Sequence, residues 1–432
     1  MSNIANKFET TREMKDSGIE WIGVIPKEWS ISPLKSAIKA VKVIEEDNQN
    51  VLSLGIKGVK QRDISKNDGM LASNYSGHQS VFPGQLVFCP RDLDGGLLVG
   101  VSKYYGCISN LYMVFDSLKE SDNQFIEYLI RGAEVCDYWI QHSYGMRYSY
   151  NRSQFLGIPV PIPSLNEQQS IANYLDEQVE KIDELIAEQN QAIENWKAYK
   201  QSLITEKVTK GLNPSVEMKD SGIEWMGDVP EKWKIVSVKY LFEKIFTGNS
   251  LNDSEKNIYS TGDEGHPYIS TKDIDGDNYS INYKTGLTIP YNSDKFKIAQ
   301  KNSILLCIEG GSAGRKISIT DRDVCFVNKL CSFHSSNNLN KYLFYLLASE
   351  CFKQPFFLKL IGLIGGVSVS KLKEIKLPIT SLFEQQAIAN YLDEKCLKID
   401  QMIEQKQVFI KQLEEYKQSL IYECVTGKRC VL

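Results

Sequence analysis

Two long segments of the chain carry apolar residues at intervals of three and four, which is the spacing of one helical face. The first runs from Ser164 to Gly211 and the second begins at Ser381. The apolar positions of the first segment are Ile171, Leu175, Val179, Ile182, Ile186, Ile193, Trp196 and Leu203. Those of the second are Ile388, Leu392, Cys396, Ile399, Ile403, Ile410, Leu413 and Leu420. Neither Gly nor Pro interrupts either run. Each segment therefore predicts a helix of about 45 residues, roughly 65 Å long.

The two segments are copies of each other. The stretch from Glu167 to Glu177 recurs as the stretch from Glu384 to Glu394, and the two differ only at Ser170 and Ala387. A narrow apolar stripe on so long a rod needs a partner stripe, and tandem copies related by a pseudo-two-fold axis place their rods antiparallel. We therefore expect an antiparallel coiled coil within the chain. Its expected interface comprises all the apolar positions above except Val179 and Cys396; the alternative is two helices that pack separately.

Polar residues at the start of each rod recur as well. Ser164 with Glu167, and Ser381 with Glu384, have the spacing of a capping box. Identity at exposed positions is not required for packing, so recent duplication or a shared docking surface would explain it. The repeated residues expected to be exposed are Glu167, Gln168, Gln169, Asn173 and Asp176.

A second repeat defines the organisation of the chain. The sequence MKDSGIEWIGVIPKEW at 14–29 recurs as MKDSGIEWMGDVPEKW at 218–233. Its tryptophans, Trp21, Trp29, Trp225 and Trp233, are expected to fill a hydrophobic groove near the helices. The predicted divisions are a first globular region at 1–163, a first helix at 164–211, a linker and second globular region at 212–380, and a second helix with its tail at 381–432.

The globular regions share little sequence although their flanks nearly match. Both read as short strands with helices, including helices within 121–140 and at 340–357 and a strand, Gly-rich turn and strand at 302–320. The fold class expected is α+β: two mixed α/β domains joined by two long helices in a pseudo-two-fold tandem repeat. Divergence between matching flanks suggests two modules that perform one task on two targets.

Composition narrows the class of protein. A length of 432 residues suits two or three domains, and no apolar run approaches the roughly 18 residues of a membrane helix. The ten cysteines form no CxxC pair, so reduced thiols in the cytoplasm are expected. The net charge of −4 conceals an uneven distribution: residues 234–382 hold 19 basic against 14 acidic residues, whereas both rods are acidic.

Motifs for catalysis and cofactors do not stand out. The Gly-rich turn at 310–316 lacks Walker A spacing, although its backbone, Arg315 and Lys316 suit a DNA phosphate. Asp273, Asp275 and Asp277 begin like a calcium loop, but Asn278 replaces the glycine and Lys284 the final acid. We find no adenine-methyltransferase tetrapeptide, GxSxG or HExxH. No cofactor, metal or catalytic residue is predicted.

The repeated Pro…Ser-Leu-x-Glu-Gln-Gln-x-Ile-Ala-x-Tyr-Leu-Asp at 163–176 and 378–393 resembles the signature of type I restriction–modification specificity subunits. The segments at 21–29 and 225–233 resemble the start of that family's repeats. The resemblance implies two target recognition domains, each of which reads half of a split double-stranded DNA sequence. It also implies helices that set the gap and dock two methyltransferase subunits, which bind S-adenosylmethionine and methylate adenine. A motor–nuclease subunit would cut DNA, and this chain would be non-catalytic.

Candidate DNA contacts follow from residue type and placement in loops. They are Arg91, Lys103, Arg147 and Arg152 in the first globular region and Lys272, Lys297, Arg315, Lys316 and Lys329 in the second. Two other classes remain open. A coiled-coil scaffold would bind no DNA, and an enzyme with an unrecognised site would turn over substrate alone.

Overall fold

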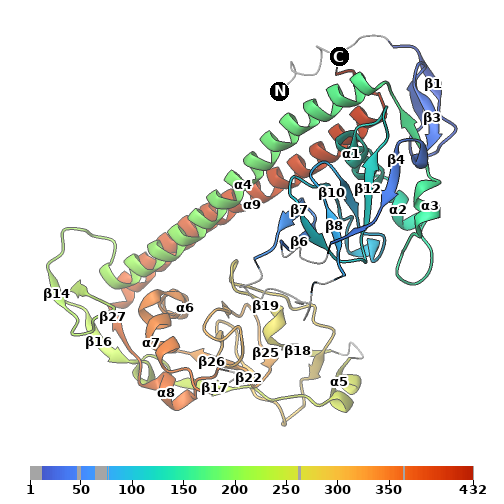
Figure 1. Ribbon diagram of the computed structural model, residues 1–432. Helices are drawn as coiled ribbons and strands as arrows, with labels where there is room; N and C mark the ends of the chain where they lie inside the picture. The colour runs from blue at the N-terminus through green and yellow to red at the C-terminus, as the bar shows by residue number, and fades with distance from the viewer. Residues whose placement is uncertain are drawn as a thin grey trace. The chain divides into compact units, whose positions relative to one another are not determined.

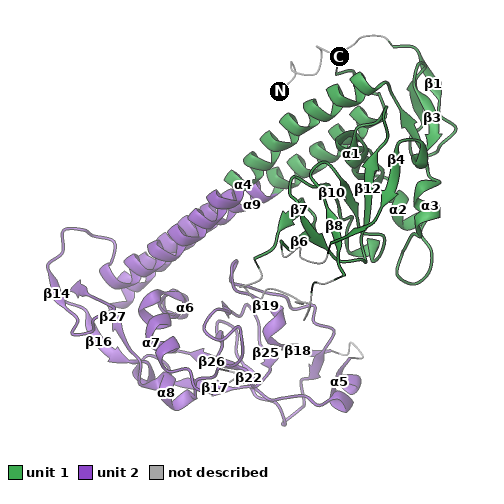
Figure 2. Cartoon of the chain, viewed as in Figure 1, with its two compact units in different colours: residues 1–188, 408–432 green, residues 189–407 purple. Residues whose placement is uncertain are grey.

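The chain forms two compact units (Figure 2), and each long helix contributes to both. The computed structural model describes residues 12–45, 50–63, 75, 77–260, 264–362 and 365–431. Unit 1 comprises residues 1–188 and 408–432, and unit 2 comprises residues 189–407. Helix α4 spans Leu165–Lys210 and α9 spans Leu382–Val425. Each unit therefore consists of one globular region together with one stretch of each helix.

The two helices pair antiparallel, as the sequence predicted. In unit 2, Lys406 Nζ donates to Gln189 Oε1 at 2.8 Å, and Lys200 Nζ lies 2.7 Å from Asp400 Oδ1. The residue numbers on α9 therefore decrease as those on α4 increase. In unit 1, Lys417 Nζ lies 2.7 Å from Asp183 Oδ1. All fourteen apolar positions assigned to the interface are buried or half-buried. Burial is what an interface between the helices requires, and the assignment of these residues to that interface stays a prediction.

Unit 1 is built on a four-stranded antiparallel sheet in the order β10-β9-β12-β4 (Figure 1). A second sheet, β11-β8-β5, and the pairs β1-β2, β3-β13 and β6-β7 complete it. The elements are β1 Met14–Asp16, β2 Val24–Pro26, β3 Ser30–Pro33, η1 Leu34–Ser36, β4 Ile38–Val41, β5 Val43–Ile44, β6 Leu52–Gly55, β7 Gly58–Gln61, β8 Gln79–Val81, β9 Leu86–Phe88, η2 Leu93–Gly95, β10 Val99–Val101, β11 Gly106–Ile108, β12 Met113–Ser117, α1 Asn123–Glu134, α2 Tyr138–Gln141, α3 Arg152–Leu156 and β13 Pro159–Ile162.

Unit 2 contains two four-stranded sheets, β17-β26-β23-β24 and β21-β18-β25-β22, and in the second β18 and β25 run parallel. The pairs β14-β15, β16-β27 and β19-β20 complete it. The elements are β14 Met218–Asp220, β15 Asp228–Pro230, β16 Lys234–Ser237, η3 Val238–Tyr240, β17 Lys244–Thr247, α5 Asp253–Tyr259, β18 Gly265–Ile269, η4 Thr271–Asp273, β19 Ile274–Asp275, β20 Ser280–Ile281, β21 Thr288–Pro290, β22 Ile298–Ala299, β23 Ile304–Cys307, β24 Ile317–Ile319, β25 Val324–Phe326, β26 Leu330–His334, α6 Asn340–Ala348, α7 Glu350–Leu358, α8 Val369–Lys373 and β27 Lys376–Ile379.

The globular regions repeat one architecture despite their different sequences. The sheet β4-β12-β9-β10 of unit 1 has the strand order of β17-β26-β23-β24 in unit 2. The starts of α6, α8 and β27 follow the starts of α1, α3 and β13 by one common offset, which is also the offset between Glu167 and Glu384. We call residues related by this offset counterparts. The flanking repeats and the buried strands therefore preserve the fold while the loops between them differ.

The tryptophan of each N-terminal motif ties the globular region to the start of its helix. Trp29 Nε1 donates to Glu167 Oε2 at 3.0 Å, and Trp233 Nε1 donates to Glu384 Oε2 at 3.0 Å. Both indoles are buried. The predicted capping box is only half formed: Glu167 N and Glu384 N donate to the serine hydroxyls at 3.4 Å, but the two carboxylates face the tryptophans instead.

The expectation for Trp225 was wrong, because its side chain is 42% exposed. The equivalent tryptophan in unit 1, Trp21, packs against Tyr138 at 5.4 Å, and its carbonyl accepts a hydrogen bond from Tyr422 Oη at 2.9 Å. The counterpart of Tyr422 on α4 is Thr205, which is too short to supply the same cover.

Several repeated polar residues expected to be exposed are in fact structural. Gln168 and Gln385 are buried, and each accepts at 3.0 Å from the backbone N–H that precedes α1 or α6. Glu167 is also buried. Asp176 accepts from Tyr128 Oη at 2.6 Å, as Asp393 accepts from Tyr345 Oη at 2.6 Å. Packing therefore explains the identity of these residues but not that of the exposed Gln169 and Asn173.

The single helix expected at 340–357 is two helices. Ser349 adopts an extended conformation between α6 and α7, with φ −78° and ψ 159°. Its hydroxyl donates to Leu346 O at 2.7 Å, and its carbonyl accepts from Phe352 N and Lys353 N. Serine thus closes one helix and opens the next, which explains why apolar periodicity alone missed the break.

Replacing Trp233 with Phe should destabilise the protein, because Glu384 loses a buried donor and the smaller ring leaves a gap in the core. We expect a loss of roughly 1–3 kcal/mol in the free energy of unfolding, measured by urea denaturation. Trp225→Phe is the matched control, and its exposed side chain should cost at most about 0.5 kcal/mol. Equal losses for the two variants would contradict the assignment.

Candidate nucleic-acid interface

In unit 1, two loops meet beside the central sheet. One is the connection at 89–98 between β9 and β10, and the other is the turn at 144–149, which is closed by a bridge between Tyr144 and Ser149. Asp92 N donates to Arg147 O at 2.9 Å, and Tyr150 N donates to Pro90 O at 2.9 Å. Backbone hydrogen bonds thus hold the two loops together, independently of their side chains.

Unit 2 builds the same junction from different residues. The Gly-rich turn at 308–316 joins β23 to β24, and a bridge between Ile361 and Gly366 closes the second loop. Gly310 N donates to Gly365 O at 2.8 Å. At Gly314, φ is +73° and an added Cβ would lie 2.8 Å from the Phe356 ring, so this turn requires glycine. Both units therefore have this junction of two loops at the same place, but the side chains on the loops differ between the units.

Two of the four candidates in unit 1 lie at this junction. Arg91 is exposed, and Arg147 Nε is 3.7 Å from Asp92 Oδ1 with 73% of its side chain exposed. Arg152 is exposed at the first residue of α3, close in sequence to the second loop. Lys103 is not brought together with them, because it follows β10 whereas the junction precedes that strand. It lies beside the exposed Tyr104 and Tyr105.

Four of the five candidates in unit 2 gather around its junction. Lys272, Arg315 and Lys316 line one depression of about 680 Å³. Lys316 Nζ donates to Thr271 O at 2.9 Å, whereas the Arg315 side chain has no hydrogen bond or ion pair among the described residues. Ile308 N donates to Lys329 O at 2.9 Å, which places Lys329 beside the turn. Lys297 lies elsewhere, and its Nζ donates to Thr247 O at 3.0 Å.

The depressions of unit 2 share some of their lining residues. Lys272 also lines a neighbouring depression of about 460 Å³ that contains Lys329. Arg315 also lines a third, of about 570 Å³, which reaches Lys197 and Lys200 on α4. Exposed guanidinium and ammonium groups around these depressions can hold phosphates, and free donors can also reach base edges.

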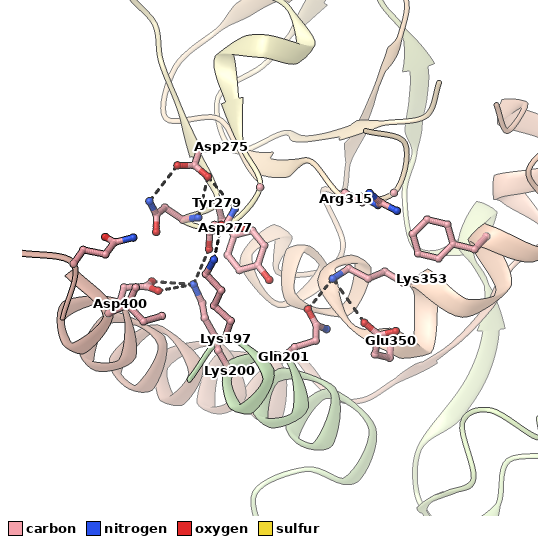
Figure 3. Close-up of a pocket in the computed structure, with 16 residues that line it drawn as sticks. Lys197, Lys200, Gln201, Asp275, Asp277, Tyr279, Arg315, Glu350, Lys353 and Asp400 are labelled. Atoms are coloured by element: carbon pink, nitrogen blue, oxygen red, sulfur yellow. Dashed lines mark hydrogen bonds and ion pairs between the residues drawn. The ribbon is translucent and has the colours of Figure 1, made fainter. Parts of the chain in front are cut away.

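Sequence reasoning missed the charged cluster in the third depression (Figure 3). Lys197 pairs with Asp277 at 3.2 Å, and this hydrogen bond raises the pKa of Lys197. Burial lowers the pKa of Lys353, which donates to Gln201 Oε1 at 2.7 Å. Because these lysines already have partners, the cluster is suited to holding elements together. The available signal was the repeat itself, in which Lys200 and Asp400 have Lys417 and Asp183 as their counterparts.

The aspartates of the calcium-like stretch are engaged in turns. Asp275 Oδ1 accepts from Asp277 N at 2.9 Å and from Asn278 N at 3.3 Å. Asp273 Oδ2 accepts from Ser270 N at 2.8 Å. Within the described part of the chain, no group of three or more His, Cys, Asp or Glu side chains is arranged to hold a metal, and no helix is long and apolar enough to cross a membrane.

Comparison with known proteins places these features in one family. The family described as type I restriction modification DNA specificity domain matches residues 99–195 and 230–412. The chain is 24% identical to the putative type I restriction enzyme MjaX specificity subunit of Methanocaldococcus jannaschii, over 94% of this chain and 95% of that one. It is 25% identical to the MjaVIII specificity subunit of the same organism, over 94% and 93%.

A solved chain from work on complex assembly and conformational transition of the type I R-M system has the same fold. Its TM-score is 0.71 at 15% sequence identity, and the alignment covers 94% of this chain and 99% of that chain. The likeness extends over both globular regions and both helices.

Proposed function

This chain belongs to the type I restriction–modification DNA specificity family, and we propose that it selects the DNA sequence on which a methyltransferase and nuclease complex acts. Each globular region recognises one half of a split double-stranded target, and the helix pair fixes the spacer between the halves. The supporting observation is that each unit builds a junction of two loops. The junction lies at the same place relative to the corresponding sheet of each unit, and it carries different basic residues in the two units.

Two recognition domains that read one split target need a rigid carrier. Half-sites read from one face of DNA lie about one helical turn, roughly 34 Å, apart. A flexible linker would sample many distances, whereas a paired helix holds one. Candidate contacts to phosphates and bases are Arg91, Arg147 and Arg152 in unit 1 and Lys272, Arg315, Lys316 and Lys329 in unit 2; Lys103 and Lys297 would act separately.

The chemistry would belong to partner subunits. The relatives are specificity subunits of restriction enzymes, and we propose that this chain likewise binds double-stranded DNA, two methyltransferase subunits and motor–nuclease subunits without itself catalysing a reaction. S-adenosylmethionine and ATP would bind to those partners, and this chain would need no cofactor. The alternative that this chain is a scaffold without DNA binding is tested by the methylation mapping described next.

The direct test is methylation mapping. The chain is expressed with its methyltransferase in a cell that lacks other adenine methylation, and modified bases are located by sequencing. A single split motif is expected. A stable complex that methylates no defined motif would favour a scaffold that does not select DNA, and turnover by the isolated chain would favour an enzyme.

Arg315→Gln should weaken DNA binding by the assembled complex by roughly 1–3 kcal/mol, because Arg315 has a free guanidinium at the junction. If the contact is to phosphate, all sequences weaken alike and the salt slope falls by about one; if it is to a base, one position of the motif relaxes. Fluorescence anisotropy with target and scrambled duplexes measures both.

Arg322→Gln is the matched control. Arg322 is already paired with Asp321 at 2.7 Å and lies 4.4 Å from the Tyr283 ring centroid. Affinity should therefore change little. Unchanged binding by Arg315→Gln, or an equal loss in both variants, would argue against the junction as the interface.

A repeated surface supports the docking of two copies of one partner. Gln169, Asn173 and Glu177 recur as Gln386, Asn390 and Glu394, and all six are exposed. Their spacing of four residues puts each set on one helical face. Intramolecular packing does not require this identity, whereas two identical methyltransferase subunits would.

Asn173→Arg combined with Asn390→Arg should prevent assembly with the methyltransferase, because a bulky charge enters both docking surfaces. Each single variant should retain one methyltransferase, as measured by size-exclusion chromatography with light scattering. Asn195→Arg is the control, because Asn195 is exposed on α4 and its counterpart is Gln412. Full assembly of the double variant would refute the docking assignment.

A further inference from the structure

The tip of one hairpin in unit 2 touches both the basic junction and the helix pair. Strands β19 and β20 are joined by residues 276–279. Backbone carbonyl Arg315 O lies 2.7 Å from the position of an added Cβ on Gly276, so the tip is seated directly against the Gly-rich turn. The Tyr279 ring packs edge-on against Phe344 of α6 at 5.3 Å. The tip thus connects the candidate DNA contacts to the interior of the unit.

Lys200 of α4 holds this tip (Figure 3). Its ammonium lies 2.7 and 2.9 Å from the two carboxylate oxygens of Asp400 on α9, and it donates to Asp277 O at 3.1 Å. It also lies 4.6 Å from the centroid of the Tyr279 ring. One positive charge therefore joins both long helices to the hairpin of the recognition domain.

The environment makes this contact specific. The Lys200 side chain is only 5% exposed, so its charge needs its partners to offset the loss of hydration. Tyr279 has φ +54°, which a residue other than glycine rarely adopts. The buried charge of Lys200 and the constrained backbone at Tyr279 therefore both restrict movement of the hairpin tip. The neighbouring pair Lys197–Asp277 is more exposed and therefore a weaker restraint.

Among the described residues, the corresponding pair of the other repeat makes no such link. Lys417 and Asp183 are the counterparts of Lys200 and Asp400, and they make the same ion pair at 2.7 Å. Lys417 is 27% exposed and, among the described residues, pairs with Asp183 alone. The repeat therefore provides an internal control: the same ion pair between the helices occurs once with a bond to a hairpin of the globular region and once, in the part of the chain that the structure describes, without one.

We propose that Lys200 is a positioning residue that fixes the second recognition domain on the helix pair and thereby sets which spacer lengths the protein accepts. The inference rests on the proposed function. Without this link, the hairpin tip and the turn that carries Arg315 could shift along α4, and half-sites at other spacings would be reached at lower cost.

The test is the spacer selectivity of the assembled methyltransferase complex. Methylation rates are compared on the mapped target and on targets with the spacer one base pair longer or shorter. For Lys200→Met we expect the ratio of native to altered spacer to fall by up to about tenfold, the scale of one charge-assisted hydrogen bond. Asp400 is 30% exposed, so water can solvate it in this variant. Asp400→Asn should give a smaller fall.

Lys417→Met is the matched control and should keep the wild-type ratio. A general loss of stability would lower all rates together and leave the ratio unchanged, which would overturn the positioning role. An equal fall in Lys200→Met and Lys417→Met would also overturn it, because the effect would then belong to the helices alone. If the wild-type complex yields no split motif, the proposed function itself fails, and this inference fails with it.

Discussion

A long amphipathic helix must bury a narrow apolar stripe, and this constraint determines the organisation of the chain. The helices comprise 46 and 44 residues, and the apolar stripe along each one extends through both units. The duplication supplies the partner, since each helix offers the other a matching stripe and both units contain a stretch of the pair. Everything that carries specificity is attached to this framework.

The attachment is a small set of hydrogen bonds that the repeat preserves. A tryptophan donates to the first-turn glutamate of each helix, a buried glutamine reaches the backbone before α1 or α6, and a tyrosine donates to an aspartate two turns along. These bonds explain why polar residues in the repeats are identical. They do not explain the identity of the exposed Gln169, Asn173 and Glu177 in the two copies, for which we propose a common partner.

The helices and their antiparallel pairing could be predicted because periodicity and duplication are written in the sequence. Buried glutamates and glutamines could not, because Glu167 and Gln168 look solvent-exposed until the globular region covers them. Arg91 and Arg147 lie on two loops that are far apart in sequence and are held together by backbone hydrogen bonds, which no local sequence pattern encodes. Lys200 was missed for the same reason. In the sequence it looks like an exposed residue of a charged helix, and only the fold brings Asp277 and Tyr279 against it.

We propose that each globular region reads its half of the target independently of the other. Strands β3 and β13 pair from Ser30 to Ile162 and enclose the first region, so residues 30–163 can be exchanged as a unit with those of another family member. Methylation mapping of the exchanged protein tests the claim. One half of the motif should change while the other half and the spacer stay the same. Change in both halves, or in neither, would contradict it.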